Sequence, residues 1–250
     1  MKNKLLYVTD LIDWDLSSNI LERFIPFEKE RLAEIIVMSP VSPRELIDTI
    51  SGTSITFKEE ISKTLSAERI VDFAVGEGVS CMALRLDGES YESLCSEVTK
   101  KTSIPVLVMN GDVSQRRLME HVIFLTDRNL VAQGALEYIL RYRNVIDELE
   151  IIHVINQKLT VKDMRELKDR LQVTRNVFLD AGIDAESHLY AGKEGEEILT
   201  ASRDYRGTII ILGEEPRRSF IKGLFKKSFV SEVMSDANIP VGFIPNKTKG

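Results

Sequence analysis

The stretch SEVTKKTSIPVLVMN at residues 96–110 returns in altered form as SEVMSDANIPVGFIPN at residues 231–246. In both stretches, Ser-Glu-Val is followed by polar residues, then by Ile-Pro-Val and a short apolar run. A second matched pair precedes them in the same order, because apolar runs end in Thr-Asp at Asp10 and at Asp127. Two matched anchors in one order indicate an internal duplication.

The second copy shows short apolar runs alternating with segments of helical apolar spacing. The expected strands are residues 121–126, 149–155, 185–190, 208–212 and 240–245, and the expected helices are 130–142, 160–182, 195–205 and 228–236. This alternation predicts an α/β fold, with a parallel sheet and helices on both faces. We expect domains at residues 1–112 and 115–250, joined by the linker NGDVSQRRLM.

The helix expected at residues 160–182 carries signals at both ends. Thr160, with Asp163 three residues later, has the spacing of a capping box. Gly182 fits the stop of the same helix, because glycine accepts the left-handed conformation that ends many helices.

The composition excludes several classes of protein. The chain has 250 residues and a formal charge of −6, which argues against a nucleic-acid binder. No apolar stretch approaches the roughly 18 residues of a membrane span, and Asp10 interrupts the N-terminal apolar run too early for a signal peptide. We therefore expect no contact with a membrane. The two cysteines form no CxxC pair, which fits a reducing compartment, and we expect a cytoplasmic protein.

Positive charge gathers in GEEPRRSFIKGLFKKS, residues 213–228, directly after the apolar run TIIIL. The cationic side chains are Arg217, Arg218, Lys222, Lys226 and Lys227. Ligands of parallel α/β sheets lie outside the carboxyl ends of the strands, where Asp127 and Gly213 are both expected. The segment is open to three interpretations: a solvated loop, a phosphate site, or a docking patch for an acidic partner.

Several motifs resemble the universal stress proteins in their tandem, two-domain form. They are VTD and LTD at the strand ends, LEIIHVI, GKEGEEIL and the two Ile-Pro-Val strands. The resemblance implies two flavodoxin-like, adenine nucleotide α hydrolase-like domains with five strands each, paired antiparallel through their last strands as an intrachain pseudo-dimer. Many members of the family bind ATP or AMP, while others bind no nucleotide.

Nucleotide-binding members have a loop of the form Gly-x-x-Gly, nine residues, then Gly-Ser or Gly-Thr. Gly213 matches its first glycine and Ser228 its hydroxyl residue, whereas Pro216 and Lys227 replace the other two glycines. Pro216 offers no N–H to a phosphate, although the nearby cations could take over that contact. In the first copy this loop is shortened, and we expect no nucleotide there.

By resemblance, Asp127 faces the ribose and the backbone of Val154 meets the adenine. Asp127 equally suits a helix cap, and Val154 a core position. The expected site comprises Leu125, Asp127, Val154, Gly213, Arg217, Lys222, Ser228 and Phe229.

We therefore expect a regulatory module that binds ATP or AMP in its second domain. The alternative is a nucleotide-free interaction protein that docks through the basic segment at residues 217–227. Neither catalytic residues nor a metal site are expected, since His121 and His188 lack metal-ligand spacing, and slow ATP hydrolysis ranks last. Cys95 lies near an expected helix start, where a thiol can be activated. An unknown protein partner and a homodimer of the two-domain chain complete the expectations.

Overall fold

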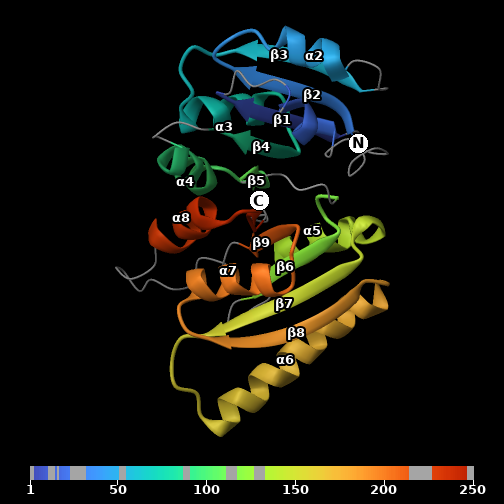
Figure 1. Cartoon of the computed structure of the whole chain (residues 1–250), viewed down its shortest axis with the longest axis vertical. Helices are drawn as coiled ribbons and strands as arrows, with labels where there is room; N and C mark the ends of the chain where they lie inside the picture. The colour runs from blue at the N-terminus through green and yellow to red at the C-terminus, as the bar shows by residue number, and fades with distance from the viewer. Residues whose placement is uncertain are drawn as a thin grey trace.

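The computed structural model describes residues 3–10, 15, 17–22, 32–50, 55–86, 91–110, 117–126, 133–213 and 227–246. Its strands form a ten-stranded sheet in the order β3-β2-β1-β4-β5-β10-β9-β6-β7-β8. In Figure 1, β3 and β8 lie at the two ends of this sheet and β5 lies in its middle. In the strand order, β10 is the neighbour of β5.

The strands come from the two parts of the chain in mirrored order. The first five are β1 (Asn3–Thr9), β2 (Leu32–Ser39), β3 (Thr56–Ile61), β4 (Cys81–Arg85) and β5 (Val106–Val108). The next five are β6 (His121–Thr126), β7 (Glu148–Ile155), β8 (Asp184–Ala191), β9 (Ile209–Gly213) and β10 (Val241–Ile244). The two sets meet where β5 pairs antiparallel with β10, and the other neighbouring strands pair in parallel. The predicted antiparallel pairing is thus confirmed.

Two hydrophobic clusters cover the two faces of the sheet. The first cluster takes side chains from α2 (Arg44–Ile50), α5 (Gln133–Arg141) and α6 (Val161–Asp180). The second takes side chains from α3 (Ala67–Gly76), α4 (Tyr91–Lys101), α7 (Glu194–Asp204) and α8 (Lys227–Asp236). A short 3₁₀ turn, η1 (Arg143–Val145), follows α5. The structure therefore confirms the predicted parallel α/β fold with helices on both faces.

The end signals of α6 are confirmed. The Thr160 hydroxyl accepts a hydrogen bond from the backbone N–H of Asp163, and the Asp163 carboxylate accepts one from the backbone N–H of Thr160. Gly182 follows the helix with φ +85°, the left-handed conformation that glycine adopts without steric cost. Of the helix predicted at residues 130–142, the structure describes α5 (Gln133–Arg141), and residues 130–132 lie outside the described ranges.

None of the described helices combines the length and the apolar character needed to cross a bilayer. The longest of the helices above, α6, has 20 residues, but polar and charged side chains cover most of its outer face.

Candidate functional site

The strand order places a topological switch between β6 and β9. From β6 the chain runs outward through β7 to β8, and it then returns to the other side of β6 as β9. In open parallel sheets the loops that leave the strands diverge at such a point, and ligands bind in the crevice outside the carboxyl ends. The carboxyl ends of β6 and β9 therefore mark the candidate site.

Three of the predicted site residues lie at this edge of the sheet. Leu125 of β6 pairs in register with Leu212 of β9, and Gly213 is the last residue of β9. Val154 lies near the end of the next strand, β7, and its side chain is 5% exposed within the core. The fold thus brings Leu125, Gly213 and Val154 to neighbouring strand ends, although they are far apart in the sequence.

A close contact between α5 and the C-terminal strand forms part of the same edge. The backbone N–H of Gly134 donates to Asn246 Oδ1 at 3.2 Å. A Cβ added at Gly134 would lie 2.8 Å from the backbone oxygen of Pro245, so a side chain there would push the two segments apart. Gly134 and Asn246 were missed by the sequence analysis, because only the fold brings residue 134 near the C-terminal strand.

The remaining predicted residues are described in part or not at all. Ser228 and Phe229 lie in the first turn of α8, which follows β9 and therefore starts from the carboxyl edge of the sheet. A helix start there adds a partial positive charge, which favours phosphate. Asp127, Arg217 and Lys222 lie outside the described residues.

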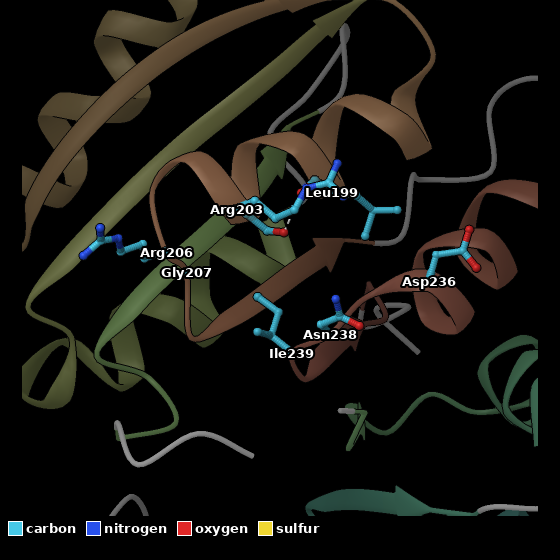
Figure 2. Close-up of a pocket in the computed structure, with 8 residues that line it drawn as sticks. Leu199, Arg203, Arg206, Gly207, Asp236, Asn238 and Ile239 are labelled. Carbon is cyan, nitrogen blue, oxygen red and sulfur yellow. Dashed lines mark hydrogen bonds between the residues drawn. The ribbon is translucent and has the colours of Figure 1, made fainter. Parts of the chain in front are cut away.

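Two cavities lie outside this group of predicted residues. One, of about 320 Å³, is lined by Arg203 of α7, Asp236 of α8 and the segments that lead into β9 and β10 (Figure 2). It therefore opens at the amino ends of those strands, away from the switch point. The other, of about 290 Å³, lies after β7 beside the first turns of α6, and its charged lining residues are Lys158, Asp163, Glu166 and Arg170.

The thiol of Cys95 contradicts one expectation from the sequence. Its side chain is 0% exposed in the cluster that α4 forms with the sheet. Burial, together with the charge of Asp10, raises the pKa of Cys95 to about 12. An activated thiol needs a lowered pKa and access to solvent, so Cys95 is a core residue.

Comparison with solved structures bears on the fold as a whole. The chain aligns with the crystal structure of a universal stress protein from Archaeoglobus fulgidus DSM 4304 with a TM-score of 0.69, over 98% of this chain and 96% of that chain. The fold is that of the universal stress proteins. The aligned sequences are 22% identical, so the likeness concerns the backbone rather than individual site residues.

A second solved structure also aligns with the whole chain. A functionally unknown protein from Pseudomonas aeruginosa PAO1 aligns over 98% of this chain and 93% of its own, with a TM-score of 0.67 and 13% identity. The sequence matches no protein-family model and no curated protein. The universal stress protein fold is therefore shown by the three-dimensional structure, which agrees with the resemblance seen in the motifs.

Proposed function

We propose that this chain is a tandem universal stress protein whose second half binds an adenine nucleotide, ATP or AMP, at the switch point between β6 and β9. The observation that carries the proposal is the convergence of Leu125, Val154 and Gly213 on neighbouring strand ends. The start of α8 comes from the same edge and favours the phosphates. In this arrangement Asp127 receives the ribose hydroxyls, and Arg217 and Lys222 contact the phosphates.

The role of the site is regulation rather than catalysis. Nucleotide binding changes the conformation of residues 213–227, and a protein partner distinguishes the nucleotide-bound protein from the nucleotide-free one. In this proposal residues 1–112 and 115–250 act as the two members of an intrachain pseudo-dimer in the cytoplasm, and two chains associate into a homodimer. The antiparallel pairing of β5 with β10 supports the intrachain arrangement.

The test starts from gently purified protein. Nucleotide released on denaturation is identified by chromatography, and ATP and AMP are titrated calorimetrically into the stripped protein. We expect micromolar binding that Asp127→Ala abolishes and that Asp10→Ala, the same change at the matching position of the first half, leaves intact. Full binding by Asp127→Ala would overturn the placement, and loss in Asp10→Ala alone would move the site to the first half.

A second function is favoured by two residues of the stretch 213–228. Pro216 and Lys227 stand where nucleotide-binding members have glycines, so two backbone approaches to phosphate are lost. On this alternative the chain binds no nucleotide and docks onto an acidic partner through residues 217–227. No released nucleotide and no heat at millimolar ATP would favour it. Identical partners captured by the wild type and by a charge-reversed segment would exclude docking there.

A further inference from the structure

The two halves of the sheet can be compared position by position. Lys4 and His121 are equivalent, because each lies five residues before the threonine that ends its strand. The backbone oxygens of both accept a hydrogen bond from the hydroxyl of the residue just before the neighbouring strand. The donors are Ser80, before β4, at 2.9 Å and Thr208, before β9, at 3.0 Å. The strand register can therefore be carried from one half to the other.

Comparison of the two halves in this register shows one core position at which an apolar residue in the first half corresponds to a charged residue in the second. Lys4 lies opposite Glu34 and His121 lies opposite Glu148, so the residues two positions further on, Ile36 and Glu150, are also equivalent. Ile36 is 1% exposed and packs in the apolar cluster. Glu150 is 8% exposed. A carboxylate in such a place costs several kcal/mol unless other groups compensate it, so packing alone does not explain Glu150.

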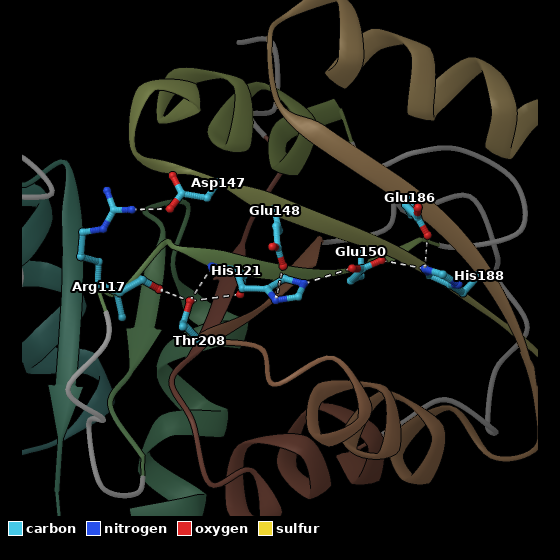
Figure 3. A network of polar contacts seen from close by, with 9 residues as sticks. Arg117, His121, Asp147, Glu148, Glu150, Glu186, His188 and Thr208 are labelled. Atoms are coloured by element: carbon cyan, nitrogen blue, oxygen red, sulfur yellow. Dashed lines mark hydrogen bonds and ion pairs between the residues drawn. The ribbon is translucent and has the colours of Figure 1, made fainter.

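The groups around Glu150 form a continuous chain across three strands (Figure 3). Glu150 Oε2 lies 2.6 Å from His188 Nε2, and the same nitrogen lies 3.8 Å from Glu186 Oε2. Within the ranges that the structure describes, the ligand atoms of Glu150, Glu186 and His188 all converge within 4.8 Å of one another. Tetrahedral zinc, with bonds of about 2.0–2.2 Å, holds its donor atoms about 3.3–3.6 Å apart. Side-chain shifts of less than about 1 Å therefore suffice to admit the ion.

Neighbouring side chains hold these ligands in place. Tyr205 stacks on the His188 ring with centroids 4.6 Å apart, and its hydroxyl lies 3.0 Å from His188 Nδ1. His121 Nε2 lies 3.1 Å from Glu150 Oε1, and its Nδ1 lies 3.0 Å from Glu148 Oε2. Polar partners of this kind, one step behind the ligands, orient histidine and carboxylate in metal sites and strengthen binding.

We propose that Glu150, Glu186 and His188 bind a divalent transition metal, with zinc as the best fit. One imidazole and two carboxylates suit zinc, and three protein ligands leave a fourth position for water. Glu186 is exposed on β8, the strand at the end of the sheet, so the ion enters from solvent and meets Glu150 at the buried side. The first half has Ile36 and Lys58 at the positions of Glu150 and Glu186, and it therefore lacks such a site.

The experiment uses the full-length protein, without an affinity tag and dialysed against a chelator. Zn²⁺ is titrated calorimetrically, and Co²⁺ is added as a spectroscopic probe, because its absorption reports nitrogen and oxygen ligands around the ion. We expect one equivalent to bind with micromolar affinity, and Glu186→Gln and His188→Gln each to weaken binding at least tenfold.

Asp184→Asn is the matched control, because Asp184 is an exposed acid on the same strand that lies outside the cluster. It should bind zinc as the wild type does. No zinc heat and no Co²⁺ absorption in the wild type would overturn the proposal, as would equal affinities of Glu186→Gln and Asp184→Asn. Since Asp127→Ala should leave zinc binding unchanged, failure of the nucleotide site and failure of the metal site are distinguishable.

Discussion

Gly242 of β10 lies opposite Leu107 of β5, and a Cβ added at Gly242 would come within 2.9 Å of a Leu107 methyl carbon. On its other side the same Cβ would lie 2.7 Å from Cδ1 of Ile211. The side chains of Leu107 and Ile211 therefore fill the space beside Gly242, and a side chain at this position would force them to shift.

Gly242→Val should destabilise the protein by about 1–3 kcal/mol, because overpacking a filled core forces neighbouring side chains out of their preferred rotamers. Urea unfolding measures the loss, and Gly242→Ala should show a smaller one. An unchanged unfolding midpoint for the valine variant would mean that β5 and β10 are not held at this distance in solution.

Gly78→Ala should lower the free energy of unfolding by roughly 1 kcal/mol. Gly78 has φ +66°, and a left-handed backbone brings an added Cβ too close to the carbonyl oxygen. Gly76→Ala is the control, because beyond the adjacent backbone an added Cβ has no atom within 4 Å at either position. The two sites differ in conformation, since Gly76 ends α3. There alanine should be neutral or stabilising by up to about 1 kcal/mol. Equal effects of the two variants, measured by thermal unfolding, would contradict the conformational explanation.

Glu34 should make stability depend on pH. The Lys58 ammonium at 2.5 Å, helped by Lys4 at 3.3 Å and opposed by burial, lowers the pKa of Glu34 below its ordinary value of 4.5. A lowered folded-state pKa adds stability above the unfolded value, and that stability disappears as pH falls through 4.5 toward the folded-state pKa.

Glu34→Gln should accordingly lower the free energy of unfolding by about 1 kcal/mol at pH 7 and by much less at pH 3. The figure is kept small because the partner lysines are partly exposed, and solvent weakens their attraction for Glu34. Urea unfolding at several pH values gives the comparison. Glu68→Gln, the same change at an exposed position of α3, serves as control. A constant difference between wild type and Glu34→Gln from pH 3 to pH 7 would contradict the assignment.

Cys95 should resist alkylation in the folded protein. Its thiol is 0% exposed, and its pKa of about 12 leaves almost no thiolate at pH 8. Mass spectrometry after brief iodoacetamide treatment should find Cys95 unmodified in buffer and modified in denaturing urea. Rapid modification of the native protein would show that α4 opens readily.

The cations of the basic segment should contribute to the binding of ATP, through its phosphates, and not to the binding of adenosine. Arg217→Glu combined with Lys222→Glu should weaken ATP tenfold or more, because each charge-assisted hydrogen bond to phosphate contributes about 1.5–3 kcal/mol. Binding of adenosine, which has no phosphate, should change little. The control reverses Arg165 and Lys168, two exposed cations of α6, with the same change in net charge. An equal loss of ATP affinity in both double variants would mean that the change in net charge, and not contact with the phosphates, weakens binding.

The sequence predicted the parts of the fold that depend on local patterns. The alternating strands and helices and the capping box at Thr160 are visible in short windows, because neighbours along the chain decide backbone conformation and helix ends. The antiparallel pairing of β5 with β10 came from the repeated Ile-Pro-Val strands and the family resemblance. For the candidate nucleotide site, Leu125, Val154 and Gly213 were placed by the same resemblance and now lie on neighbouring strands.

What only the tertiary structure decided is where distant side chains meet. His121, Glu150 and His188 are separated by about thirty or more residues and show no spacing that predicts contact. They meet because β6, β7 and β8 are neighbours in the sheet and because their register sets which residues lie side by side. The same holds for the burial of Cys95 and for the contact of Gly134 with the C-terminal strand. Register and burial arise from packing of the whole sheet, so no local stretch of sequence contains them.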